Sequence, residues 1–208
     1  MSCIDLVEGI GRRLLRVIEN HHGSTLISTP NYGWENHRFR SEKFRLAHVE
    51  IFNQDRFCVV HCCVFPHVND PSPIYGFDVI AGENKITGVF MDLSPTVLET
   101  KPFLEINTTG LKNREPPEWG NIFSPHWLAC RPTPSEMQVI GDEAVRLLVH
   151  YLSTLNIDLG NREDIVSRQN RYCIQQRQND HTRKALVNLL GEDRAKEFIE
   201  NILFPTIS

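Results

Sequence analysis

The stretch FRLAHVEIF (44–52) decides the fold of this chain, together with FCVVHCCVFP (57–66) and PIYGFDVIAG (73–82) that follow it. Side chains in these stretches alternate with a period of two, which is typical of β-strands. A fourth stretch with the same pattern covers 85–93. The links between them are short and rich in Asn, Asp, Pro and Gly, so the pattern predicts antiparallel hairpins.

Both faces of the first three strands are largely apolar, which predicts helices on each side of the sheet. In 44–52, Phe44, Leu46 and Phe52 are expected on one face with His48 and Glu50. Helices are expected at residues 3–20 and in the last third of the chain. Its longest apolar stripe consists of Met137, Ile140, Ala144, Leu147, Leu148, Tyr151 and Leu152. The prediction is one domain over 1–208, an α/β protein with a three-layer α/β/α sandwich and a central antiparallel sheet.

Between these elements, 21–35 and 96–120 are expected to be irregular, and 122–130 to form one more strand. A polar stretch at 162–184 precedes two short amphipathic helices that reach Leu203.

The composition is that of a globular protein that binds neither nucleic acid nor membrane. The 208 residues are 40% apolar and 23% charged, with a net charge of −4. This chain therefore lacks the overall positive charge that is typical of nucleic-acid-binding proteins. The apolar runs are too short to span a bilayer, and the N-terminal segment lacks the pattern of a secretory signal. The six cysteines form no C-x-x-C pair, so reduced thiols are expected rather than disulfides or a zinc site.

Three ionisable side chains stand where an ordinary core would have Val or Leu, namely Glu50, His61 and Asp78. Burying such groups is costly unless they are paired or neutralised. If the strands at 56–66 and 73–80 form a hairpin, His61 lies opposite Asp78, at a distance that permits a hydrogen bond. Gly76 on the same face leaves room for a flat ligand. The pattern alone leaves two interpretations open, a structural pair in the core or a proton-handling pocket.

Other chemistry has little support. The sequence has no G-x-S-x-G, no H-E-x-x-H and no glycine-rich phosphate loop. His21 and His22 are expected to be solvated, and Cys62 and His61 face apart on a strand.

Six segments together resemble the ferredoxin-dependent bilin reductases, most closely their phycocyanobilin-forming branch. The segments are FRLAHVEIF, VVHCCVFP, PIYGFDVIAG, DLSP, REPPEWGNIFS and RYCIQQRQNDHTRK. The resemblance runs from about residue 36 to the C-terminus. It implies an enzyme that binds biliverdin IXα between the sheet and the C-terminal helices. Such an enzyme reduces the bilin by one-electron transfers from ferredoxin, each coupled to protonation, through bilin radicals and without a metal or a bound organic cofactor.

The resemblance also implies roles for individual residues. Asp78 matches the central acid that protonates the bilin, and His61 matches the histidine that shares its proton. Glu50 matches the acid that serves the D-ring vinyl group, and Asp180 matches an acid near the A-ring. This set favours phycocyanobilin as the product. Phycoerythrobilin, formed through 15,16-dihydrobiliverdin, and a non-catalytic bilin or haem carrier remain as alternatives.

For substrate binding, the resemblance implies His48 as a supporting histidine and Arg114 as a propionate ligand. His181 stands where close relatives have Lys, and Arg183 is its basic neighbour. A monomer is expected, located in the cytoplasm of a cyanobacterium or phage-infected host, or in the plastid stroma of a eukaryote.

Ferredoxin is acidic, so its docking requires a local basic patch. The densest candidate cluster is Arg38, Arg40, Lys43 and Arg45, and a second is Arg183 with Lys184. An ordinary solvated face is an equally good interpretation of either cluster.

Overall fold

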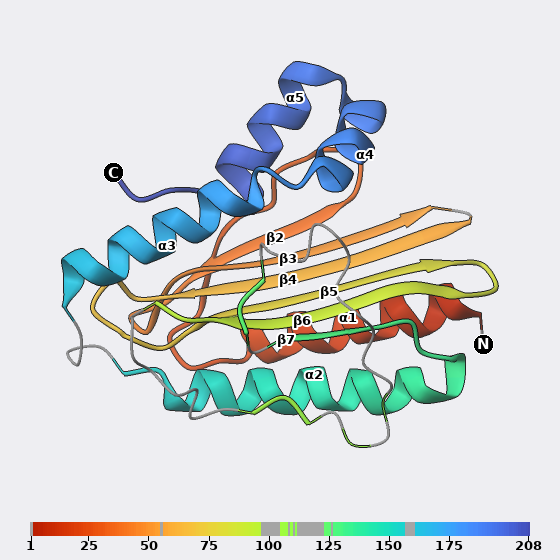
Figure 1. The fold of residues 1–208 in the computed structure, drawn as a ribbon, viewed down its shortest axis with the longest axis horizontal. Helices are drawn as coiled ribbons and strands as arrows, with labels where there is room; N and C mark the ends of the chain where they lie inside the picture. Colours follow the sequence, from red (N-terminus) through yellow and green to blue (C-terminus); the bar gives the residue numbers. More distant parts are fainter. Residues whose placement is uncertain are drawn as a thin grey trace.

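One antiparallel sheet organises the protein. The computed structural model describes residues 2–54, 56–96, 105–107, 109, 111, 123–125, 127–156 and 161–208. Within them, each strand pairs antiparallel with the next one along the chain, in the order β1 to β7 (Figure 1). The strands are β1 (Thr25–Ser28), β2 (Glu35–Arg40), β3 (Phe44–Gln54), β4 (Phe57–Pro66), β5 (Ile74–Gly82), β6 (Ile86–Ser94) and β7 (Trp127–Cys130).

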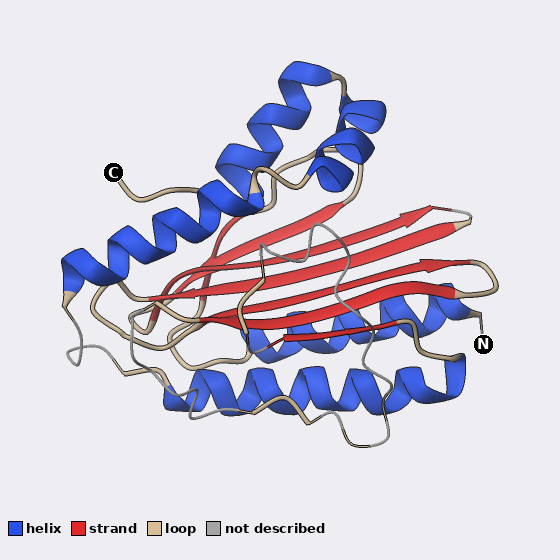
Figure 2. Cartoon of the chain, viewed as in Figure 1, coloured by secondary structure: helices blue, strands red, loops and turns tan. Residues whose placement is uncertain are grey.

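Helices cover both faces of this sheet, as Figure 2 shows. On one face lie α1 (Cys3–Glu19) and α2 (Pro134–Thr154). On the other lie α3 (Arg162–Gln176), α4 (Asp180–Leu190), α5 (Glu192–Glu197) and the π-helical segment η2 (Phe198–Leu203). The predicted α/β/α sandwich with its antiparallel sheet is therefore confirmed.

Two glycines let α1 and α2 approach their neighbours closely. A Cβ atom on Gly11 would lie 2.8 Å from Cγ2 of Val60 in β4, and one on Gly141 would lie 2.7 Å from Cγ1 of Ile10. Neither distance is possible without a shift of the neighbour. The buried hydroxyl of Tyr75 in β5 donates to the carbonyl of Ala144 in α2, at 3.0 Å. These contacts fix one helix layer against the sheet, and all seven residues of the predicted α2 stripe are buried.

The second apolar core lies under the C-terminal helices. It contains Leu46, Cys63 and Phe65 from the sheet and Phe198 from η2, among others. Cys62 belongs to the core on the opposite face, so the adjacent cysteines do face apart. All six cysteines are free and buried in the structure.

Two local predictions were wrong. Residues 21–35 are not wholly irregular, because they contain β1 and the first residue of β2. β1 is a four-residue, largely exposed edge strand, so it carries no pattern of burial and is defined only by its pairing with β2. Phe44 lies in the same core as Ala47 and Val49, opposite to the prediction. The register of β3 with β4 shifts between Phe44 and Leu46, and a bulge there reverses the alternation.

The last predicted strand is shorter than expected. β7 begins at Trp127 rather than at residue 122, and much of 96–120 lies outside the described residues. Among the described helices, none has both the length and the apolar character needed to cross a membrane.

Candidate active site

Four polar side chains form a row across the middle of the sheet, on the face that the C-terminal helices cover. Asn36 in β2 pairs with Glu50 in β3, Glu50 pairs with His61 in β4, and His61 pairs with Asp78 in β5. Cross-strand partners have Cβ atoms about 5 Å apart. The register that the sequence predicted for His61 and Asp78 is thus observed, and it places Glu50 on the other side of the same imidazole.

His61 and Asp78 form a direct hydrogen bond, with 2.8 Å between Nδ1 of the imidazole and Oδ1 of the carboxylate. The His61 side chain is 8% exposed and that of Asp78 is 39% exposed. Burial by itself would lower the pKa of His61, but the negative charge and hydrogen bond of Asp78 offset this, and the pKa lies above its ordinary value. The pair therefore holds a proton on a buried ring beside a carboxylate that solvent can reach.

Glu50 is buried, and among the described residues no cation lies at salt-bridge distance from it. Desolvation raises its pKa to about 7, although the neighbouring His61 acts in the opposite direction. A carboxyl group with a pKa near neutrality can both release and recover a proton under ordinary conditions. This is the behaviour expected of a proton donor rather than of a structural carboxylate.

A hollow of about 270 Å³ opens over one end of this row, at His61 and Asp78. Part of this volume is open solvent, so the hollow is a shallow depression in the surface rather than an enclosed cavity. Strands β4 to β6 form its floor, and α3 and the C-terminal segment form a wall. The residues that line it are His61, Gly76, Asp78, Phe90, Asp92, Phe123, Tyr172, Gln176 and Phe204. Gly76 is part of the floor as expected, and a Cβ atom there would lie 3.6 Å from the Tyr172 hydroxyl.

Sequence reasoning missed Asp92, a second carboxylate in this hollow. Asp92 is 3% exposed, and it accepts hydrogen bonds from the hydroxyls of Ser94 and Ser124. Burial raises its pKa, while the hydrogen bonds from Ser124 and Ser94 act against that effect. The signal was available, because Asp92 interrupts an apolar strand just as Asp78 does. Its contacts tie β6 to the segment that carries Phe123, whose ring stacks on Phe90.

Three further residues that the resemblance implicated, Asp180, His181 and Arg183, are not brought to this row. Asp180 is the first residue of α4 and is exposed, with a carboxylate oxygen 3.7 Å from Nε of Arg183. His181 follows it and is exposed. Arg183 lines a separate hollow of about 520 Å³ between α4, α5 and η2. Arg114 lies outside the described residues. The roles of these four residues stay predictions.

Of the basic residues considered for ferredoxin docking, Arg45 is used inside the protein. Its Nε donates to Oε1 of Gln169 at 2.6 Å, and its guanidinium lies 4.3 Å from the ring centre of Phe65. Because of the bulge in β3, this side chain faces the C-terminal helices instead of the core under α1 and α2. Arg183 and Lys184 on α4 are exposed.

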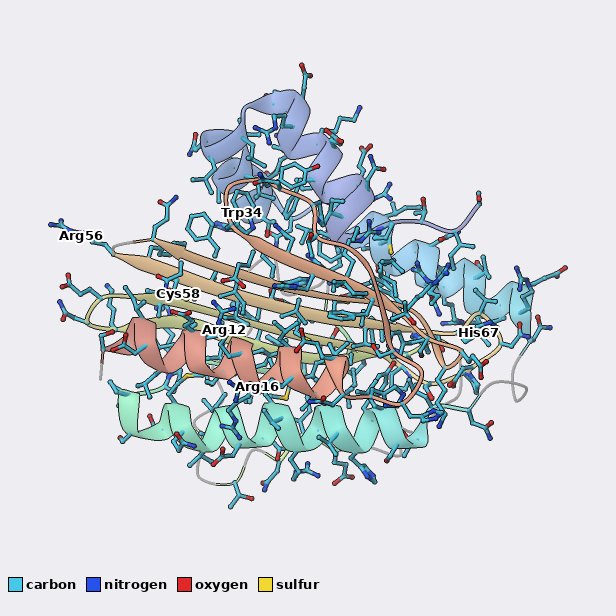
Figure 3. The ribbon with its side chains drawn as sticks, turned by 180° about the vertical axis from the view of Figure 1, so that it is seen from behind. Arg12, Arg16, Trp34, Arg56, Cys58 and His67 are labelled. Atoms are coloured by element: carbon cyan, nitrogen blue, oxygen red, sulfur yellow. The ribbon has the colours of Figure 1, made fainter. Side chains whose placement is uncertain are left out.

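The C-terminal segment closes one side of the hollow through Phe204. The ring of Phe204 packs edge-on against His61, with 6.1 Å between ring centres. Arg177 at the end of α3 holds this position, since its Nε and Nη2 donate to the Phe204 carbonyl at 3.0 and 2.7 Å. Further along, Asn170 and Ile207 exchange two hydrogen bonds. Trp34 also lies on this side of the sheet, against Phe198 of η2 (Figure 3).

We expect Arg177→Met to lower the free energy of unfolding by about 1–3 kcal/mol, because it leaves carbonyls without their charged donor. Urea unfolding monitored by circular dichroism measures this change. Arg171→Met is the matched control, on an exposed position of the same helix, and should change stability by less than about 0.5 kcal/mol. Equal losses in both variants would show that the Arg177 contacts do not fasten the C-terminal segment.

Among the described residues, no group of three or more His, Cys, Asp or Glu side chains has the arrangement of a metal site. The polar groups of the site instead form hydrogen-bonded pairs on one sheet. Such an arrangement can bind a flat molecule against the sheet and exchange protons with it.

Two solved structures have the same fold. A structure of PcyX aligns with a TM-score of 0.71 and 24% identity, covering 97% of this chain and 99% of that one. Phytochromobilin synthase from tomato, solved in complex with biliverdin, aligns with a TM-score of 0.65 and 19% identity, covering 96% and 80%.

Sequence comparison identifies relatives with more specific descriptions. The chain is 33% identical over 185 residues to phycocyanobilin:ferredoxin oxidoreductase from a Synechococcus strain, covering 82% of this chain and 75% of that protein. It is 28% identical over 184 residues to the protein of the same name from Trichodesmium erythraeum, with the same coverage. The sequence model of the ferredoxin-dependent bilin reductases matches residues 13–205. The chain therefore belongs to the ferredoxin-dependent bilin reductase family, whose members are oxidoreductases that transfer electrons from ferredoxin to a bilin.

Proposed function

We propose that this enzyme reduces biliverdin IXα to phycocyanobilin in successive one-electron steps, each followed by protonation of a bilin radical. The observation that carries the proposal is the row of Glu50, His61 and Asp78 across β3, β4 and β5. It places two carboxyl groups on either side of one buried imidazole. The hollow over Asp78 supports the placement of the bilin there, and the relatives named phycocyanobilin:ferredoxin oxidoreductase support the product.

The proposed chemistry assigns electrons and protons to different partners. Each reduced ferredoxin supplies one electron, and the full reaction consumes four electrons and four protons. The side chains of the row supply the protons, because a bilin radical becomes basic once it has gained an electron. Asp78 is the most exposed of the three and faces the hollow, so it makes the contact with the bilin. His61 returns a proton to Asp78 through their 2.8 Å hydrogen bond.

Glu50 has a distinct role in this proposal. Its pKa of about 7 makes it a proton donor at neutral pH, and it lies one strand away from His61 on the side opposite Asp78. We assign it to the D-ring vinyl group, as the family resemblance implies. A donor at that position favours phycocyanobilin over phycoerythrobilin. We further propose a cytoplasmic monomer that uses no metal and no bound organic redox cofactor.

Turnover of biliverdin with chemically defined partners tests the product. We expect anaerobic incubation with biliverdin IXα, ferredoxin and a ferredoxin-reducing system to consume the biliverdin and yield phycocyanobilin, identified by chromatography of the extracted pigment. Detection of phycoerythrobilin as the product, with 15,16-dihydrobiliverdin as the intermediate, would show that our assignment of phycocyanobilin is wrong. Biliverdin that binds with a spectral shift but stays unreduced would identify a carrier. Omission of ferredoxin is the control and should leave biliverdin unchanged.

A further inference from the structure

His48 lies two residues before Glu50 on the same face of β3, and its ring is completely buried. The ring centre lies 5.5 Å from that of His61. Nε2 of His48 is 3.1 Å from Oδ1 of Asn36 in β2, while Nδ1 is buried without a hydrogen-bond partner among the described residues. One nitrogen of this imidazole is therefore paired and the other is open.

The amide of Asn36 has only one possible orientation in this contact. Its nitrogen Nδ2 donates to the backbone carbonyl of Trp34 at 3.3 Å, and a carbonyl can only accept. The amide oxygen must therefore be the atom that faces His48. Asn36 is itself 2% exposed, so water does not compete for either end of the amide.

An amide oxygen cannot donate, so Nε2 of His48 must carry the proton of this hydrogen bond. The surroundings also keep the ring uncharged. Burial lowers the pKa of His48 well below its ordinary value, and the neighbouring His61, Arg38 and His37 act in the same direction. A neutral imidazole with its proton on Nε2 has a lone pair on Nδ1.

We propose that Asn36 is a positioning residue that fixes His48 in the Nε2–H tautomer, so that Nδ1 is presented inside the site as a hydrogen-bond acceptor. The effect of Asn36 on catalysis rests on the proposed function, whereas its effect on the tautomer of His48 does not. In the reaction, His48 then offers an acceptor beside His61, whose ring centre lies 5.5 Å away, and its neutral ring does not compete with His61 for the proton. Asn36 acts through His48 and does not need to touch the bilin.

The tautomer can be read directly in the protein without bilin or ferredoxin. The nitrogen-15 chemical shifts of a neutral imidazole distinguish its protonated nitrogen from its bare one, and His48 is assigned by the signal lost in His48→Phe. We expect a protonated Nε2 and a bare Nδ1 in the wild type. Asn36→Leu, which removes the acceptor, should redistribute the proton between both nitrogens. Asn36→Asp, which keeps an acceptor oxygen, should retain the proton on Nε2.

Turnover provides the second measurement. Loss of the partner that orients a metal-ligating histidine costs about 10–100-fold in activity. By analogy, we expect Asn36→Leu to lower kcat by about tenfold with little change in KM for biliverdin. In Asn36→Asp the carboxylate should raise the pKa of His48, so its activity should be lost at low pH and recover at high pH. Asn53→Leu is the control, because Asn53 is exposed on β3, the strand that carries His48, and its side chain donates to Glu8 at 2.6 Å.

Two results would overturn the proposal. One is a wild-type His48 with its proton on Nδ1, and the other is a tautomer that stays unchanged in Asn36→Leu. The shifts are independent of the reaction, so they decide the role of Asn36 even if turnover gives another product. If the tautomer behaves as expected but biliverdin is not reduced, the proposed function fails and the inference about Asn36 stands.

Discussion

Asp78→Asn should bind biliverdin but lose turnover by a factor of about 10²–10⁴, the usual contribution of a positioned general acid. The asparagine has the shape of the aspartate, so the hollow over His61 stays intact. It has no proton to release, so the first electron from ferredoxin should produce a bilin radical that persists. Anaerobic absorption and electron paramagnetic resonance spectra, recorded after addition of reduced ferredoxin, measure the radical and its lifetime.

A second effect of the same variant tests the His61–Asp78 pair without catalysis. Burial lowers the pKa of His61, and the charge and hydrogen bond of Asp78 are what raise it. Asp78→Asn should therefore lower the pKa of His61 below its ordinary value, which a nuclear magnetic resonance titration measures. A histidine with a raised pKa stabilises the fold below its unfolded pKa, and this contribution disappears as the pH rises through the folded value. Asp78→Asn should remove that part of the pH dependence.

Asp142→Asn is the matched control for both measurements, because Asp142 forms a 2.7 Å ion pair with Arg13 between α2 and α1, on the opposite face of the sheet. It should bind and reduce biliverdin like the wild type. Turnover of Asp78→Asn at the wild-type rate would exclude Asp78 as the central proton donor.

The pairing of His61 with Asp78 was predictable from the sequence because it depends only on a hairpin with short links and regular alternation. Regular alternation predicted the wrong face for Phe44, because a bulge inserts one residue into β3. No local sequence pattern indicated this bulge. The position of Asn36 beside the site could not be predicted from the sequence for another reason. It lies in the polar strand ENHRFR, where no apolar alternation indicates which side chains face the site.

The wall of the hollow could not be predicted from local pattern at all. Phe204 lies against His61 in a C-terminal segment that Arg177 and Asn170 fasten to α3. Those contacts join residues about 30 positions apart and depend on how the helices pack. Asp92 differs from Asn36 and Phe204, because it could have been predicted. Like Asp78, it is an ionisable residue within an otherwise apolar strand.

Glu50→Gln should make the protein more stable at alkaline pH while it removes reduction of the D-ring vinyl group. A pKa raised from 4.5 in the unfolded chain to about 7 in the fold corresponds to roughly 3 kcal/mol of stability. Between these values the folded protein binds the proton that the unfolded chain has released, so wild-type stability falls as the pH rises. Glutamine is neutral throughout. The variant should thus gain up to roughly 3 kcal/mol at pH 8 and almost nothing near pH 4.5.

Urea unfolding at several pH values measures this gain, and chromatography of the pigment should show a bilin whose D-ring vinyl group is not reduced.

Glu143→Gln is the control. Glu143 is equally buried, but it is paired with Arg146 at 2.7 Å and accepts from the backbone of Asn107 at 2.8 Å. Removal of its charge should lower stability, because Arg146 and the backbone amide of Asn107 lose their charged partner. If Glu50→Gln also lost stability at pH 8, the fold would favour the carboxylate, and Glu50 would be a structural group. If Glu50→Gln gains stability and Glu143→Gln does not, the carboxyl group of Glu50 destabilises the fold at alkaline pH. A residue that is kept at such a cost is expected to serve the reaction, here as a proton donor to the bilin.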